Sequence, residues 1–160
     1  MSVIPPFDTL FKTVGASVVG ASGVDASVQK FYADLNYRDL TVYASNGRAR
    51  NNIGAWNVKN ILVGDKIKGF DFYKQKDFAM AENADIGFLI WNGESKGTLN
   101  NIINLLDMGK QSVVYLTSNK LLLNVDSEDK LKALLELCPN ATKELYEKLT
   151  FKSYNQASLI

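Results

Sequence analysis

The stretch from Ala84 to Asn101 constrains the fold of this chain more than any other. Residues 86–90 are an uninterrupted apolar run, which predicts a strand buried on both faces. A polar, glycine-bearing turn follows, and Ser95 is a suitable N-cap for a helix whose apolar residues recur near helical spacing. A strand, a turn and a helix in this order leave backbone N–H groups and the positive end of the helix dipole facing outward. This geometry favours a phosphate or another anion, although an ordinary strand–turn–helix connection has the same pattern.

The rest of the chain alternates between strand and helix patterns in the same way. The periodicity predicts helices over residues 7–14, 25–35, 71–83, 127–137 and 141–149, and strands over residues 16–19, 40–44, 112–116 and 121–125, with the last at a sheet edge; residues 58–63 fit a strand or a loose connection. Such alternation indicates right-handed β-α-β crossovers. The predicted fold class is therefore α/β, a Rossmann-like three-layer sandwich with a mainly parallel sheet. The length of 160 residues predicts a single domain over residues 1–150 and a polar C-terminal tail over residues 151–160.

Composition excludes several function classes. The formal charge of +1 makes no strong case for nucleic acid or an anionic membrane surface as a partner. The chain has no histidine, which removes Ser-His-Asp and Cys-His catalysis and most zinc and iron sites, so we expect no metal and no cofactor. Cys138 is the only cysteine and is interpreted as a buried, small apolar residue in a reducing compartment. The start of the chain lacks an apolar run of signal or membrane-span length, so we expect a cytoplasmic protein.

Three polar segments each follow a predicted strand. They are the glycine turn Gly20–Asp25, the segment Ser45–Trp56 and the turn Trp91–Thr98. Ligands of parallel α/β sheets bind beyond the carboxyl ends of the strands. The sequence therefore predicts that these three segments converge on one site.

Together these motifs resemble the nucleotide-binding signature of the SLOG superfamily, which includes the Lonely Guy phosphoribohydrolases and the DNA-processing protein A fold. The resemblance rests on the apolar strand with the loop Trp91–Thr98, on Gly109-Lys110 before the next strand, and on the turn Gly20–Asp25. The segment Arg50–Trp56 is similar to one in uncharacterised bacterial and phage members. The resemblance covers about residues 8–125 and implies a Rossmann-like fold with a nucleotide at this edge of the sheet.

The chain departs from the superfamily pattern at functionally important positions. No counterpart of the first strand and its glycine loop is present in residues 1–11, so part of the expected phosphate cradle is missing. Asn101 stands where the enzymes have their catalytic glutamate, and Asn92 stands where an aspartate is expected. The turn at Gly20 is also one residue shorter than the family pattern. An amide neither accepts a proton as a carboxylate does nor forms a glycosyl ester, so the chemistry that the resemblance implies lacks its central group.

The candidate ligand-binding residues come from all three segments. Gly93, Ser95, Gly97 and Thr98 are expected to hold a phosphate, and Arg50 is either a further ligand or a solvated charge. Trp56 and Trp91 are expected either to stack on a base or to pack in the core. The full set is Gly20, Ser22, Gly23, Asp25, Arg50, Asn51, Asn52, Trp56, Trp91, Gly93, Ser95, Gly97, Thr98 and Asn101.

The favoured hypothesis is non-catalytic binding of a nucleotide or nucleotide-derived small molecule. One alternative is an enzyme that acts on an N-glycosidic bond, a phosphoribohydrolase or deoxyribosyltransferase-like protein in which Glu94 or Asp25 replaces the missing glutamate. Both carboxylates also have ordinary explanations, as a solvated charge in a turn and as a helix cap. A third hypothesis is an interaction protein that has lost its ligand. The resemblance also implies a homo-oligomer, because members of the superfamily form dimers or larger assemblies.

Overall fold

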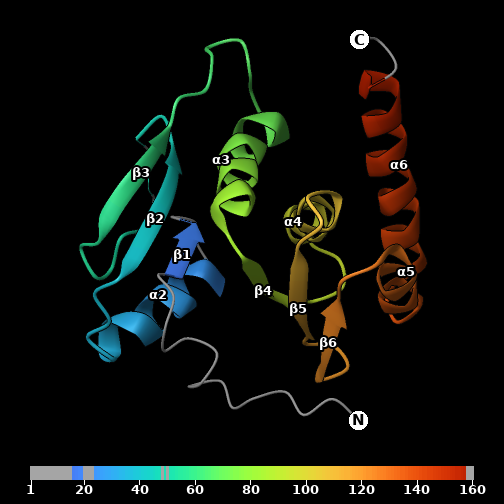
Figure 1. The fold of residues 1–160 in the computed structure, drawn as a ribbon, viewed down its shortest axis with the longest axis horizontal. Coiled ribbons are helices and arrows are strands. Elements are labelled where there is room, and N and C mark those ends of the chain that lie inside the picture. The colour runs from blue at the N-terminus through green and yellow to red at the C-terminus, as the bar shows by residue number, and fades with distance from the viewer. Residues whose placement is uncertain (1–15, 20–23, 48, 50, 158–160) are drawn as a thin grey trace. The chain divides into compact units, whose positions relative to one another are not determined.

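This computed structural model describes residues 16–19, 24–47, 49 and 51–157, which contain both strands and helices (Figure 1). In chain order the elements are β1 (Ala16–Val19), α2 (Val24–Asp34), β2 (Leu40–Ser45), β3 (Asn57–Ile61), α3 (Phe70–Asn83), β4 (Ile86–Trp91), α4 (Lys96–Asp107), β5 (Gln111–Leu116), β6 (Leu121–Val125), α5 (Glu128–Glu136) and α6 (Asn140–Ala157). The predicted α/β class is confirmed. The predicted helix over residues 7–14 lies outside the described residues.

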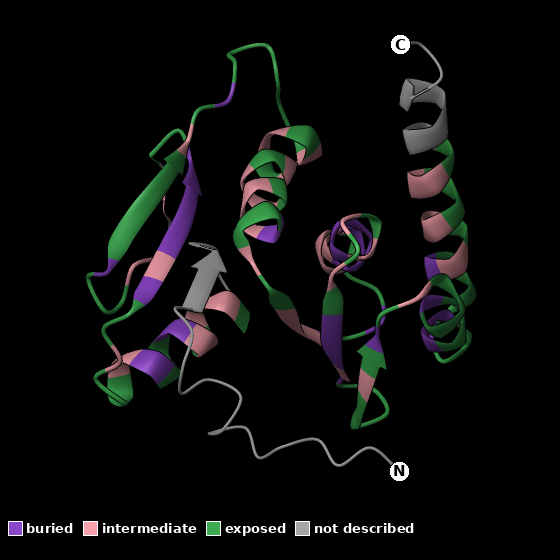
Figure 2. Ribbon diagram, in the orientation of Figure 1, coloured by how far each residue is buried: buried purple, intermediate pink, exposed green. Residues whose placement is uncertain are grey.

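The chain divides into two compact units, Met1–Met80 and Ala81–Ile160. In the first unit, β1, β2 and β3 form a parallel three-stranded sheet with β2 in the centre. The central strand is buried along nearly its whole length, whereas β3 at the edge is mostly exposed (Figure 2). Because its residues are mostly polar and exposed, periodicity alone does not distinguish this strand from a loose connection. Tyr32 of α2 packs with Leu40 and Val42 of β2 to form the core of this unit, together with Trp56.

The second unit contains a mixed sheet in the order β4-β5-β6. Strands β4 and β5 are parallel, and β6 pairs antiparallel with β5. The prediction that β4 is buried on both faces was wrong, because Ile86 is exposed and residues 87–90 are only partly buried. Within the described residues β4 pairs with β5 alone, so its apolar run belongs to an edge strand of this sheet. Strand β5, which has a neighbour on each side, is the well-buried one.

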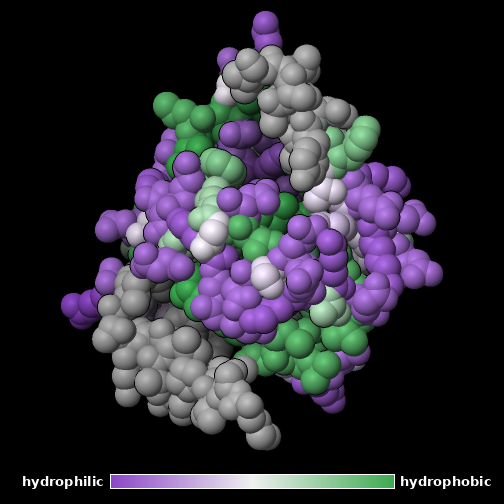
Figure 3. Space-filling view, turned by 45° about the vertical axis from the view of Figure 1, so that its right-hand side comes forward, coloured by the Kyte–Doolittle hydropathy of each residue, from purple (hydrophilic) through white to green (hydrophobic). Residues whose placement is uncertain are grey.

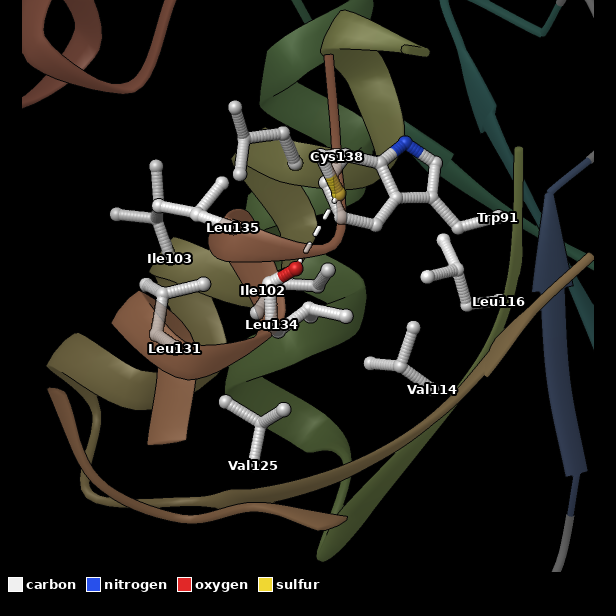
Figure 4. Packing of buried hydrophobic residues seen from close by; sticks show 11 residues of the cluster. Trp91, Ile102, Ile103, Val114, Leu116, Val125, Leu131, Leu134, Leu135 and Cys138 are labelled. Carbon is white, nitrogen blue, oxygen red and sulfur yellow. Dashed lines mark hydrogen bonds between the residues drawn. The ribbon is translucent and has the colours of Figure 1, made fainter. Parts of the chain in front are cut away.

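A hydrophobic core fills the space between this sheet and the helices of the second unit (Figure 4). Leucine and isoleucine side chains of α4 meet those of α5, over Val114 and Leu116 of β5. Cys138 lies in this core, as the sequence predicts, and its Sγ donates a hydrogen bond to the Leu134 carbonyl oxygen at 3.4 Å. Burial also raises the pKa of the Cys138 thiol, which disfavours the reactive thiolate.

The last helix is longer than the sequence predicts. Helix α6 continues to Ala157, so most of the segment expected as a polar tail is helical. Its residues Leu145, Tyr146 and Leu149 pack against the core cluster. None of the helices within the described residues is both long and apolar enough to cross a membrane.

Candidate functional site

The loop between β4 and α4 takes its shape from side chains that bond to its own backbone. The Asn92 Oδ1 atom accepts hydrogen bonds from the backbone N–H groups of Glu94 and Ser95, each at 3.0 Å. Ser95 is the N-cap of α4, as predicted, and its Oγ accepts from the Thr98 backbone N–H at 3.5 Å and from the Thr98 hydroxyl at 3.2 Å. These hydrogen bonds fix the shape of the loop, which leads directly into the N-terminus of α4.

Gly93 anchors this loop to the beginning of α6. Its φ of +85° lies in the left-handed region that glycine tolerates, and a Cβ at this position would lie 3.5 Å from both the Cys138 Sγ and a Leu116 methyl. The Thr142 hydroxyl donates a hydrogen bond to the Gly93 carbonyl oxygen at 2.6 Å. Gly93 thus holds the loop against the core.

Three asparagines of α4 carry buried amide atoms without hydrogen-bond partners. The atoms are Asn100 Nδ2, Asn101 Oδ1 and Asn104 Nδ2. Asn100 is only 5% exposed and Asn104 9%. Gly97, Asn101 and Asn104 fall at positions i, i+4 and i+7 and so lie along one side of the helix, with Asn100 at its border. We call Gly97, Asn100, Asn101 and Asn104 the amide face of α4.

Space is open at the Gly97 end of the amide face. A Cβ built on Gly97 would have no heavy atom within 4 Å. Helical side chains lean toward the N-terminus, so Asn101 leans toward the turn that contains Gly97. The backbone at the start of α4 is therefore accessible next to an unpaired amide.

The candidate residues predicted from the sequence include Asn101 but not Asn100 or Asn104. The signal was present, because these polar residues interrupt an otherwise apolar helix at helical spacing.

Both tryptophans are core residues, which agrees with the packing alternative. Trp91 is 1% exposed, and its indole N–H donates to the Ser95 carbonyl oxygen at 3.1 Å. Trp56 is 8% exposed, and its indole N–H donates to the Tyr37 carbonyl oxygen at 2.7 Å. A Cβ on Gly54 would overlap the Trp56 ring, so only a glycine fits against it there. Each ring thus supports the loop beside it by packing and by one hydrogen bond.

In the first unit, Asn51 and Asn52 shape the segment before β3. The Asn52 side chain accepts from the Trp56 backbone N–H at 2.9 Å and donates to the Trp56 carbonyl oxygen at 2.7 Å. The fully buried Gln29 amide of α2 donates to the Asn51 carbonyl oxygen and accepts from the Ile53 N–H. This agrees with the alternative that the two asparagines shape the turn. Gly20, Ser22, Gly23 and Arg50 lie outside the described residues.

Asp25 lies in the first turn of α2 and interacts with charged residues of α3. Burial raises the pKa of Asp25 to about 6, the Lys76 ammonium group lowers it, and the Asp77 carboxylate raises it again. Lys76 and Asp77 form a largely buried ion pair at 2.5 Å, and burial also raises the pKa of Asp77. Asp25 is therefore a carboxyl group that exchanges its proton closer to neutral pH than an ordinary aspartate.

A groove of about 540 Å³ lies beside the β4–α4 loop in the second unit. It runs between Glu94 and the first turns of α6, where Pro139, Ala141 and Leu145 give it an apolar wall and Glu144 and Lys148 give it opposite charges. Glu94 is exposed at its margin, in keeping with a solvated charge. Within the described residues no three His, Cys, Asp or Glu side chains gather as a metal ion would require.

The predicted site residues fall into two groups. Trp91, Gly93, Ser95, Gly97, Thr98 and Asn101 lie together in the second unit, and Asp25, Asn51, Asn52 and Trp56 belong to the first. Their convergence on one site stays a prediction. Comparison with protein-family models, with curated proteins and with solved structures finds no match.

Proposed function

We propose that this protein binds a nucleotide or a nucleotide-derived small molecule at the N-terminus of α4, without catalysing a reaction. The unpaired amide atoms of Asn100, Asn101 and Asn104 are the observation that carries the proposal. A buried polar group without a partner costs about 1–3 kcal/mol, and folded proteins rarely keep one. A ligand that supplies the missing partners would recover this cost when it binds.

The amide face is suited to a molecule that has an anionic end and a base. The helix dipole and the accessible backbone at Gly97 favour a phosphate. From Gly97 to Asn104 the helix rises by about 10 Å, at 1.5 Å per residue, which is the distance that the sugar and base of a ligand bound at Gly97 have to span to reach Asn104. An asparagine amide has a donor and an acceptor side by side, as the edge of adenine does, so the two pair well.

Binding without catalysis follows from the residue at position 101. The resemblance to the SLOG superfamily implies a catalytic glutamate there, and this chain has Asn101 instead. The proposal includes the Rossmann-like three-layer sandwich that this resemblance implies. The parallel pairs β1–β2 and β4–β5, joined through α2 and α4 respectively, support that fold.

A thermal-shift panel tests the proposal. The melting temperature is measured with nucleoside monophosphates, cyclic nucleotides, ADP-ribose and inorganic phosphate at millimolar concentration. A ligand at a hundred times its Kd stabilises the folded state by about 2.7 kcal/mol, so at least one nucleotide should raise the melting temperature clearly. No shift with any nucleotide would count decisively against the proposal.

A pair of variants locates the ligand on the amide face. Asn104→Leu removes one unpaired amide at similar volume, so it should abolish the nucleotide shift and leave the free protein at least as stable as before. The matched control Asn119→Leu changes an exposed asparagine after β5 and should keep the shift. A shift of unchanged size in Asn104→Leu would place the ligand elsewhere.

Asp25 supports a second candidate function, cleavage of an N-glycosidic bond. A carboxyl with a pKa of about 6 is suited to proton transfer near neutral pH. This function predicts release of free base from a nucleoside monophosphate, measured by chromatography. Asp25→Asn should abolish the release, and Asp34→Asn, which changes an exposed aspartate of the same helix, should retain it. If the wild-type protein releases no base, the second function is excluded.

A further inference from the structure

Strand β6 is an exposed apolar edge of the sheet in the second unit. It pairs with β5 on one side and ends the sheet among the described residues. Leu121 is 43% exposed and Leu122 38%. On the face of the molecule that Figure 3 shows, hydrophobic and hydrophilic surface are mixed. Half of the backbone N–H and C=O groups of such an edge point away from the sheet. Proteins commonly protect an edge strand with lysine, proline or a bulge, but β6 reads Leu-Leu-Leu-Asn-Val.

The two faces of β6 differ in character. Val125 is buried in the core of the unit, and Leu123 packs against it, so the odd-numbered residues of the strand face the helices. Leu122 and Asn124 lie on the opposite face. A strand that pairs with the free edge of β6 must therefore have apolar side chains on the face of the sheet that the helices cover.

The charged residues that flank β6 are complementary about the centre of the strand. Lys120 directly precedes the strand and Asp126 directly follows it, and both are exposed. If a second copy pairs antiparallel about a two-fold axis at Leu123, the end of β6 that carries Lys120 in each copy lies next to the end that carries Asp126 in the other. The same register places the exposed Leu121 beside the buried Val125 on the helix side, and Leu123 beside its own copy at the axis. On the other face Leu122 lies opposite Asn124, so the symmetric arrangement matches the charges at both ends of the strand and apolar residues on the helix side only.

We propose that two copies of this chain associate through β6, antiparallel about a two-fold axis at Leu123, so that their β4-β5-β6 sheets join into one continuous sheet. Asp126 already accepts a hydrogen bond from Lys130 at 2.7 Å, but this ion pair is exposed and therefore weak. The Asp126 carboxylate can therefore also pair with Lys120 of the second copy. The pairing does not depend on the nucleotide site. Failure of either proposal leaves the other standing.

Charge exchange at the two flanking positions tests the pairing. The full chain is studied by sedimentation equilibrium over a range of concentrations. Lys120→Asp and Asp126→Lys each replace two attractions in the dimer by two repulsions, and each should weaken dimerisation by about tenfold. An equimolar mixture of the two variants should dimerise as tightly as the wild type, because each edge again meets its opposite charge. Aspartate tolerates the left-handed backbone at position 120, where φ is +53°, so this change adds no strain.

Two further variants test whether the dimer forms through β6 or through another surface. Leu122→Lys places a charge in the middle of the edge and should give a folded monomer, with folding checked by circular dichroism. Lys132→Asp, on the exposed surface of α5, should leave the dimer intact. The proposal is overturned if the wild-type chain is monomeric at every concentration, if the dimer survives Leu122→Lys, or if mixing the charge variants restores nothing.

Discussion

Burial of the Asp25 carboxyl makes the stability of the fold depend on pH. Its pKa of about 6 is above the ordinary value of 3.8, so the folded protein holds this proton more tightly than the unfolded chain does. The resulting stabilisation is complete below about pH 4 and is lost as the pH rises through 6. Asp25→Asn stays neutral at every pH. We therefore predict that it raises the melting temperature at pH 7 and changes it little at pH 4.

The measurement is the melting temperature of both proteins between pH 4 and pH 8. Part of the pH dependence should remain in Asp25→Asn, because burial raises the pKa of Asp77 in the same direction. Asp34→Asn, at an exposed aspartate paired with Lys30, should keep the wild-type profile. Parallel profiles for wild type and Asp25→Asn would show that the Asp25 proton is not linked to folding.

At the scale of elements, one side chain shapes the turn from β4 into α4. Asn92 accepts two backbone hydrogen bonds within this turn, from Glu94 and Ser95. We predict that Asn92→Ala lowers the free energy of unfolding by about 1–2 kcal/mol, because both N–H groups lose their acceptor. Asn92→Asp keeps an acceptor and places a negative charge near the N-terminus of α4, so it should be neutral or stabilising. Urea unfolding midpoints compare the three proteins, and equal losses in both variants would contradict this account.

Most elements were predictable because hydrophobic periodicity records which face of a helix or strand is buried. Periodicity does not record how many neighbours a strand has, which is why β4 is predicted as a buried strand although, among the residues that the structure describes, it is an edge of its sheet. It also says little about β3, whose exposed residues have no apolar face. Helix α6 continued past its amphipathic stretch because nothing in the following residues breaks a helix.

The candidate site was predictable only in part. The turn at Asn92 and Gly93 and the N-cap at Ser95 depend on neighbouring residues along the chain, so the sequence predicts them. The position of Trp56 depends on Tyr37, whose carbonyl accepts its indole N–H across a long sequence separation, so a tryptophan in a polar segment gave no sign of its burial. The amide face depends on a different non-local property. Whether Asn100 and Asn104 have partners is decided by what packs on α4 and not by their spacing.

At the scale of the whole molecule, each unit has its own hydrophobic core and its own tryptophan. Among the described residues, the core of the second unit contains eleven buried residues, including Trp91, and that of the first contains four, including Trp56. Since buried apolar area is the main source of stability, the second unit should resist denaturant better. The chain has only these two tryptophans. Trp56→Phe therefore leaves Trp91 as the fluorescent reporter of the second unit, and Trp91→Phe leaves Trp56 as the reporter of the first.

We predict that the two single-tryptophan proteins report different unfolding transitions. The fluorescence of Trp91, measured in Trp56→Phe, should change at a higher urea concentration than that of Trp56, measured in Trp91→Phe. Each substitution also removes an indole hydrogen bond, worth about 1 kcal/mol, from the unit that is not being observed. Circular dichroism of the wild-type chain, which observes both units without any substitution, should therefore show a broadened transition or two steps. A single sharp transition, coincident for all probes, would mean that the two units unfold as one cooperative structure.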